Sequence, residues 1–254
     1  LITEPRAAGS FRLALAGRPA AVIVGNEQRL ASSGTSPNGL LLRWNGPLTD
    51  TTGKQLDLSV TMRVELLDQS IRFQLDALNR TDRRLSEAWY PILGGISGVG
   101  DRRDTQWTRG DWFLNSPVTP PAEAETVETY PFWMGKPWIE FYNTKLNQAV
   151  YFSPHDLLGR LQSFRYERRP GFKPSGEPDY DLPIGVINQI YTPFTKPGET
   201  FEGPPVVIQF HDGDWHTGAK IYRKWFTSNF KIRDPRKDWL RQEMAFQVMM
   251  FLFP

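Results

Sequence analysis

Alternation of apolar and polar residues with a period of two is the feature that most constrains the fold of this chain. Residues 58–66 and 71–78 both alternate in this way, with aliphatic or aromatic side chains on one face and mainly Arg, Glu, Gln and Asp on the other. Successive side chains of a strand point to opposite faces of a sheet, which produces this period. Residues 67–70 connect the two segments, so together they predict an antiparallel hairpin that is buried on one face.

Turn-forming residues extend this prediction to the rest of the chain. The sequence has 21 Gly and 21 Pro among 254 residues, above the roughly 12% that proteins average. A helical bundle would not tolerate so many helix breakers, whereas short strands joined by turns would. We therefore expect an all-β fold. Further strands are expected within residues 11–24, 40–44, 88–93, 111–114, 138–142, 149–152, 184–191 and 205–211.

Three segments rich in Gly, Pro or Glu are predicted to be loops, namely residues 94–100, 117–128 and 170–183. The Gly-rich segment 94–100 matches neither the dinucleotide-binding fingerprint nor the nucleophile elbow of hydrolases, and no helical pattern follows it. No cofactor is expected from this sequence.

One segment has the period of a helix. Trp215, Ala219, Tyr222 and Phe226 recur on one helical face, and Asp214 is well placed as the N-cap. These residues predict a helix over 215–228. Beyond a polar link, residues 244–253 are nearly all apolar, which is typical of a strand buried on both faces. We expect the polypeptide to continue into an α/β domain.

Charge and composition exclude several classes of protein. The 30 Lys and Arg balance 28 Asp and Glu to a net charge of +2, so no dominant field predicts a nucleic-acid partner. The chain lacks the roughly 18 to 20 consecutive apolar residues of a membrane-spanning helix, and its mean hydropathy is −0.46. With no cysteine, disulfides, thiol nucleophiles and thiolate zinc sites are excluded. The first residue, Leu1, is compatible with a removed leader peptide, so a secreted or periplasmic location is favoured.

The three histidines are the first candidates for chemistry. His211 and His216 lie with two carboxylates in the segment HDGDWH, which suggests metal binding or acid–base catalysis. The same segment also fits a strand-to-helix corner, which we favour, and we expect no metal site. His155 follows a predicted strand, and its neighbours Ser153 and Asp156 are too close in sequence to form a catalytic triad with it.

Aromatic residues in the middle third suggest a carbohydrate ligand, because aromatic faces stack on sugar rings while nearby polar groups bind hydroxyls. Trp112 and Trp133 are among these residues, and Asp111 is one of several loop acids nearby. Large aromatics also fill sandwich cores, so we assign at least half of them to the core. Glycoside hydrolysis needs two facing carboxyl groups, and the spacing of the acids singles out no pair.

Several segments taken together resemble a known class of proteins. Residues 210–226, FHDGDWHTGAKIYRKWF, resemble the segment that closes the N-terminal β-sandwich of (β/α)₈ glycoside hydrolase-like proteins related to α-galactosidases, including a family with a DUF6259 domain. Residues 89–96 (WYPILGGI), 130–134 (YPFWM) and 150–156 (VYFSPHD) are similar to other strands and turns of that domain.

The resemblance implies a galactose-mutarotase-like super-sandwich of two large antiparallel sheets over residues 1–212. It also implies a linker helix and connection over 213–238, and the first strand of a barrel over 239–254. The catalytic carboxylates of such an enzyme would lie on the barrel, beyond Pro254. By the same resemblance the sandwich loops line part of the sugar cleft, with Trp133, His155 and Asp156 as contacts; Trp112 and Asp111 are added from the aromatic and acidic loops.

Three functions follow as hypotheses. The favoured one is a non-catalytic N-terminal sandwich of a carbohydrate-active enzyme, whose partners are a carbohydrate substrate and the barrel of the same polypeptide. The second is an independent carbohydrate-binding or mutarotase-like sandwich. The third is an interaction module that uses the apolar segment 244–253 as a partner surface.

Overall fold

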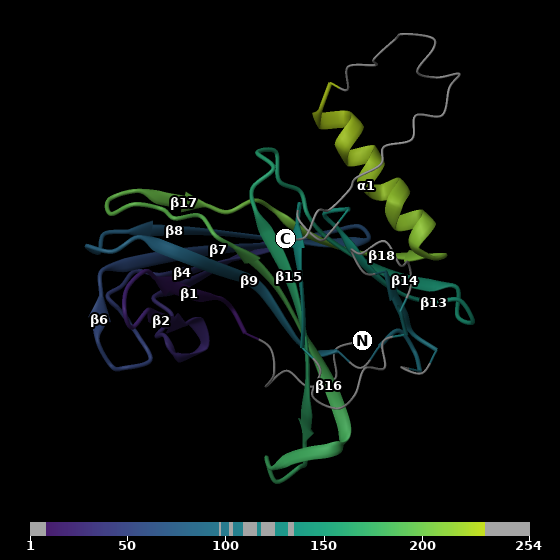
Figure 1. Cartoon of the computed structure of the whole chain (residues 1–254), viewed down its shortest axis with the longest axis horizontal. Helices are drawn as coiled ribbons and strands as arrows, with labels where there is room; N and C mark the ends of the chain where they lie inside the picture. The colour runs from purple at the N-terminus through teal and green to yellow at the C-terminus, as the bar shows by residue number, and fades with distance from the viewer. Residues whose placement is uncertain are drawn as a thin grey trace, which may run out of the picture.

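The computed structural model describes residues 9–96, 98–101, 104–108, 116–117, 125–131 and 135–231. In this part of the chain two antiparallel sheets pack face to face, and a single α-helix lies outside them (Figure 1). This confirms the predicted all-β two-sheet super-sandwich with a C-terminal helix. The predicted barrel strand, residues 239–254, lies outside the described residues.

The first sheet has six strands, and its two central ones are the longest. Their order is β12 (Glu125–Tyr130), β15 (Gln162–Phe172), β16 (Pro178–Tyr191), β9 (Leu85–Ile96), β1 (Arg12–Leu15) and β2 (Ala21–Val24). A 3₁₀ turn, η2 (Gly25–Glu27), follows β2.

The second sheet has ten strands and carries the hairpin predicted from the alternating pattern. Its order is β11 (Ser116–Pro117), β10 (Gln106–Thr108), β13 (Ile139–Asn143), β14 (Gln148–Pro154), β18 (Val206–Asp212), β8 (Ser70–Asn79), β7 (Leu58–Leu67), β4 (Gly39–Trp44) and β3 (Ser32–Ser36), with β17 (Thr200–Glu202) also paired to β8. A separate ribbon joins β5 (Leu48–Thr49) to β6 (Gln55–Leu56).

The core lies between the sheets and is rich in aromatic rings. Phe152 of the second sheet meets Phe164 of the first at 5.6 Å between ring centroids, and Trp107 meets Tyr166 at 5.2 Å. All four rings are at least 95% buried. These contacts account for the aromatic content that the sequence analysis assigned in part to the core, and burial of such rings is a large favourable term in folding.

Helix α1 (Trp215–Asn229) contacts β13 and β14 of the second sheet (Figure 1). It begins where predicted because the Asp214 side chain accepts a hydrogen bond from the backbone N–H of His216 at 3.0 Å, which satisfies one of the free donors of the first turn. No helix in the described part of the chain is long and apolar enough to cross a membrane.

Of the predicted loops, residues 170–183 are largely strand and residues 94–100 begin within a strand. Residues 170–183 fall mostly in β15 and β16, which form a long hairpin that turns near Gly176. Pro170 lies at a break in the register between Arg169 and Gly171, so the ladder does not need the N–H that proline lacks. Likewise, Gly94 belongs to β9 and pairs with Val186.

Candidate functional site

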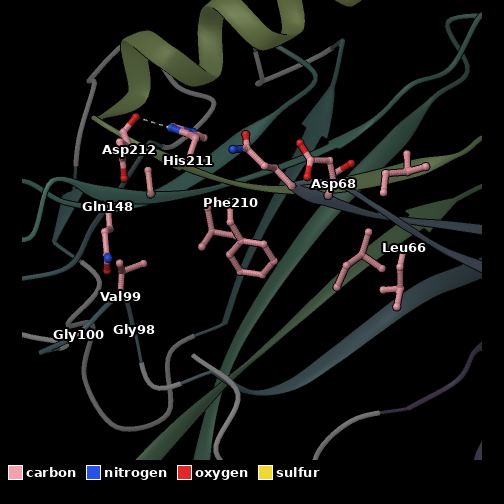
Figure 2. A pocket seen from close by; sticks show the side chains of 15 residues that line it. Leu66, Asp68, Gly98, Val99, Gly100, Gln148, Phe210, His211 and Asp212 are labelled. Atoms are coloured by element: carbon pink, nitrogen blue, oxygen red, sulfur yellow. Dashed lines mark hydrogen bonds between the residues drawn. The ribbon is translucent and has the colours of Figure 1, made fainter. Parts of the chain in front are cut away.

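A cleft of about 790 Å³ opens on the second sheet, on the face that carries the core (Figure 2). Val206, Ile208 and Phe210 are every second residue of β18, and the first two belong to the buried core, so the Phe210 ring points to that same face. The cleft is lined by Leu66, Leu67, Asp68, Gln69, Ser70, Ile71, Gly98, Val99, Gly100, Gln148, Ala149, Val150, Phe210, His211 and Asp212.

One turn, two strand ends and one glycine loop shape this cleft. The turn between β7 and β8 forms one side, the start of β14 and the end of β18 form the floor, and residues 98–100 form the other side. Gly100 has a φ of 70°, and a Cβ at this position would lie 2.3 Å from the Leu146 side chain. The positive φ strongly favours glycine at this position, which accounts for Gly100 within the Gly-rich segment that matched no motif.

Two buried polar residues fix the glycine loop. The hydroxyl of Thr105 accepts a hydrogen bond from the Val99 N–H at 2.9 Å. The Asn143 side-chain amide donates to the Val99 carbonyl at 2.8 Å. Because both partners are buried, the wall of the cleft beside Val99 is held in one position.

The lining combines an apolar platform with carboxylates and amides. Figure 2 shows the Phe210 ring at the centre, between Leu66 on one side and Val99 on the other. Phe210 is 44% exposed and Leu66 is 56% exposed, although both are large apolar residues. Around them, Asp68 and Asp212 supply carboxylates, and the lining also includes Gln69 and Gln148; its described residues include no Lys or Arg.

His211 borders the cleft, but its imidazole is directed to a buried carboxylate. Its Nε2 lies 3.4 Å from Oε1 of Glu140, and the two side chains are only 6% and 0% exposed. The Nδ1 atom lies 2.9 Å from the Asp212 carbonyl, to which it donates. Since Nδ1 carries one proton, the Nε2–Oε1 contact is favourable when a second proton is shared between His211 and Glu140.

The environment raises the pKa of both members of this pair. Burial raises the pKa of Glu140, against the opposing effect of His211. Burial alone would lower the pKa of His211, but the contacts with Glu140 and with the Asp212 carbonyl outweigh it, so the net shift is upward. The pair thus retains its shared proton to a higher pH than separated groups would.

Helix α1 closes this pair off from solvent. A Cβ placed on Gly218 would lie 1.5 Å from Oε2 of Glu140, so the helix backbone touches the carboxylate. Within the described residues neither oxygen of Glu140 forms a hydrogen bond of good geometry. The early turns of α1 place the positive end of its dipole near this negative group. Sequence analysis did not identify Glu140, because its partner His211 is distant in sequence.

The two remaining histidines are also held by protein groups. His216 lies 2.9 Å from the capping carboxylate of Asp214, in solvent. His155 stacks on Trp225 of α1 with 4.5 Å between centroids, and its Nε2 lies 3.3 Å from the Tyr151 hydroxyl. Burial, with a smaller effect of Arg72, lowers the pKa of His155 to about 4. No cluster of three or more metal-ligating side chains occurs among the described residues.

Asp156 organises its own loop. Its carboxylate accepts hydrogen bonds from the backbone N–H groups of Leu158 and Arg160 at 3.0 and 2.7 Å and forms an ion pair with the Arg160 side chain at 3.0 Å. His155 and Asp156 line a groove beside α1 together with Trp225, not the cleft at Phe210. The predicted contacts Asp111, Trp112 and Trp133 lie outside the described residues.

The cleft residues were missed because they come from distant segments. Phe210 was noted only within a strand and at the start of the segment 210–226, and Asp68 only as part of a turn. The one available signal is Phe210 itself, an aromatic residue near the end of a strand with carboxylates and histidines beside it.

Comparisons with known proteins give likenesses of fold. No protein-family model matches the chain, and no curated protein matches it. Solved structures that are similar include the GH36 α-galactosidase AgaA from Geobacillus stearothermophilus, with 12% identity, a TM-score of 0.44, and coverage of 79% of this chain and 28% of that one. Another is a Salmonella typhimurium protein described as a mutarotase, with 12% identity, a TM-score of 0.48, and coverage of 72% and 64%. A third is an Escherichia coli K12 protein described as an aldose 1-epimerase, with 10% identity, a TM-score of 0.44, and coverage of 72% and 68%.

These likenesses concern the fold alone. The chain spans 28% of the length of the α-galactosidase. Its function is therefore argued below from its own residues.

Proposed function

We propose that this chain is a non-catalytic, saccharide-binding sandwich domain of a carbohydrate-active enzyme. In this proposal the cleft at Phe210 holds a neutral sugar. The observation that carries the proposal is the half-exposed Phe210 ring, surrounded by the side chains of Asp68, Gln69, Gln148 and Asp212.

The chemistry of the cleft suits a sugar ring. A saccharide has an apolar face of C–H groups and a rim of hydroxyls, so it needs an aromatic platform and hydrogen-bonding groups around it. Phe210 supplies the platform. Carboxylates accept hydrogen bonds from hydroxyls, while glutamine amides both donate and accept. The carboxylates of Asp68 and Asp212 in this lining favour a neutral ligand over an anionic one, because they would repel an anion.

Binding without catalysis is supported by the position of the buried acid–base pair. A catalytic acid or base must reach the reacting atoms of its substrate. Glu140 is fully buried beneath Gly218, and the His211 ring is directed to Glu140. Neither group is accessible to a sugar on Phe210 while α1 remains docked.

The place of this domain in a larger enzyme is the second part of the proposal. The sandwich would span residues 1–212, the linker helix and connection 213–238, and the first barrel strand 239–254, in a parent of the glycoside hydrolase class. The partly exposed aromatic rings of Tyr222 and Phe226 on α1, and of Phe230 at its C-cap, suit a helix that packs against a further domain.

In this larger enzyme, the sugar contacts expected from the sequence would lie at a second cleft, between the sandwich and the barrel. Asp111, Trp112, Trp133, His155 and Asp156 are proposed to border the sugar cleft shared with the barrel. His155 and Asp156 are near α1, which fits a position next to the domain that follows.

A sugar epimerase is the second candidate, and the Glu140–His211 pair is the observation that favours it. A carboxylate and an imidazole that share a proton can transfer protons to and from a substrate. This function would require α1 to move from the pair, so it predicts activity that increases when the helix is undocked.

Affinity electrophoresis and calorimetry with raffinose and guar galactomannan test the proposal. We expect the chain to bind at least one of these saccharides, and Phe210→Ala to weaken that binding about tenfold, which corresponds to about 1.4 kcal/mol of stacking. Tyr180→Ala is the matched control, because Tyr180 is 64% exposed and lies outside the cleft. Absence of any saccharide response, or equal losses in both variants, would contradict the proposal.

A further inference from the structure

A second groove, of about 430 Å³, lies on the first sheet and is built around Trp89. Arg12 of β1 is the cross-strand partner of Trp89 on β9. On the other side, Arg165 of β15 is the partner of Asn188 on β16. These side chains form a row across four adjacent strands, β1, β9, β16 and β15, which run side by side.

Carboxylates fix the arrangement around Trp89. Glu87 accepts a hydrogen bond from the indole Nε1 at 2.9 Å and from the Arg12 guanidinium at 3.1 Å. The guanidinium carbon atoms of Arg12 and Arg165 lie 4.3 and 5.3 Å from the centroid of the indole. Two cations are therefore held against one aromatic ring by cation–π attraction.

A third cation lies farther along the same groove. Arg169 contacts Glu167 through both Nε and Nη2, the latter at 2.9 Å. Arg165 also pairs with Glu167, at 2.8 Å. The guanidinium groups are thus oriented before a ligand arrives, which reduces the entropy that binding costs.

The groove and the cleft differ in charge. Among the described residues, the groove lining contains Arg12, Arg165 and Arg169 but no carboxylate, since Glu87 and Glu167 hold the arginines without joining the lining. In the described part of the chain, the cleft lining contains Asp68 and Asp212 and no Lys or Arg. The two sites are suited to different ligands, an anion in the groove and a neutral molecule in the cleft.

The rest of the groove limits the size and polarity of the ligand. Its lining includes aliphatic residues, among them Ile92, Ile184 and Val186, and the amides of Asn26 and Asn188. Its volume lies within the range of about 300 to 1,000 Å³ typical of small-molecule sites. Planar guanidinium groups match the geometry of a carboxylate.

We propose that this groove binds a uronate residue of an acidic saccharide, with its carboxylate between the arginines and its ring over the aliphatic floor. The choice of a saccharide rests on the proposed function, whereas the requirement for an anion rests on the arginines alone.

Calorimetry with tri-galacturonic acid and its fully methyl-esterified form tests this proposal, because the two probes share one backbone and differ in charge. We expect the acid to bind and the ester to bind at least about tenfold more weakly, with added NaCl weakening only the acid. Arg169→Gln and Arg12→Gln should each weaken the acid about tenfold, the usual order of effect for a charge-assisted hydrogen bond.

The matched control is Arg63→Gln. Arg63 is a surface arginine paired with Asp76, and its side chain is 45% exposed, compared with 49% for Arg169. Thermal unfolding of each variant checks that it is folded. The proposal is overturned if acid and ester bind equally, or if Arg63→Gln weakens binding as much as Arg169→Gln.

A Phe210→Ala variant separates this proposal from the proposed function. If it loses the neutral sugar but keeps tri-galacturonic acid, two sites exist as inferred. If it loses tri-galacturonic acid, the anion binds in the cleft and the groove proposal fails. If no neutral sugar binds but the arginine variants still weaken the acid, the proposed cleft function fails and the groove remains.

Discussion

The imidazole of His155 lies nearly parallel to the indole of Trp225, at an interplanar angle of 16°. This stack joins the loop after β14 to the last turns of α1. Burial opposes protonation of the ring, and the positive charge of Arg72 adds to that effect. The neutral form of His155 is therefore the form that the folded protein prefers.

This preference predicts a loss of stability in mild acid. The pKa of His155 is about 4 in the folded protein and about 6.5 in an unfolded chain. Between these values the unfolded chain binds more protons, so the contribution of His155 to stability is complete above about pH 6.5 and is lost as the pH falls toward 4. Urea unfolding of wild type and His155→Phe measures it. The variant should lose less stability on acidification, and an equal loss in both proteins would contradict the assignment.

At the scale of elements, α1 and β13 meet at one glycine. The Gly218 backbone touches the Glu140 carboxylate, and a Cβ there would lie 2.7 Å from the carboxyl carbon and 3.4 Å from the ring of Tyr151. The sheet below is rigid, because Glu140 and Tyr151 are paired neighbours on β13 and β14. A larger residue at this position must therefore displace the helix.

Gly218→Ala is expected to destabilise the protein by about 1 to 3 kcal/mol, the usual cost of overpacking. Helix propensity alone predicts the opposite sign, because Ala is favoured over Gly by about 1 kcal/mol in a helix. Thermal unfolding, with the fluorescence of α1 tryptophans as a second signal, measures the effect. Gly34→Ala is the control, since a Cβ there meets nothing within 4 Å.

Removal of the opposing carboxylate completes this test. Glu140→Ala in the Gly218→Ala background should recover part of the lost stability, because it removes the group that the new methyl contacts. A Gly218→Ala protein as stable as wild type would show that α1 is not closely packed on β13.

The elements predicted correctly are those whose own segment of sequence carries a strong signal. Residues 58–66 and 71–78 were predicted as a hairpin and form β7 and β8, which extend at most one residue beyond the prediction at each strand end. The helix predicted over 215–228 ends at Asn229 and is capped by Asp214. These elements have strong periods or a specific cap, so neighbours in sequence suffice to define them.

Tertiary context decided the elements that were missed. Residues 170–183 have Pro and Gly that favour a loop, yet pairing between β15 and β16 keeps most of them in strands. The Phe210 cleft depends on the β7–β8 turn and on residues 98–100, which meet only after the second sheet forms. Pattern along the chain does not predict which distant segments become neighbours.

At the scale of the whole molecule, the structure separates acid–base groups from the proposed sugar site. The second sheet carries the Phe210 cleft on its core-side face, whereas the side chains of Glu140 and His211 are covered by α1. The first sheet carries the groove at Trp89. The proposed neutral-sugar site, the proposed anion site and the surface on which α1 docks are therefore three distinct regions.

This separation predicts that the 254-residue chain does not turn over glycosides or interconvert sugar anomers by itself. The rate of hydrolysis of p-nitrophenyl α-galactoside should equal the rate without protein. The mutarotation rate of galactose should likewise be unchanged by the protein. Rate enhancement by the wild type that disappears in Glu140→Gln would contradict the non-catalytic assignment and favour an epimerase.

The position of a bound sugar tests the central claim most directly. Nuclear Overhauser effects between a saturating neutral saccharide and the ring protons of ¹³C-labelled phenylalanine locate the ligand, with Phe210→Leu used to assign the signal. We predict intermolecular effects from the sugar C–H face to the Phe210 ring. Effects confined to other rings, or none despite measurable binding, would contradict a saccharide-binding cleft at Phe210.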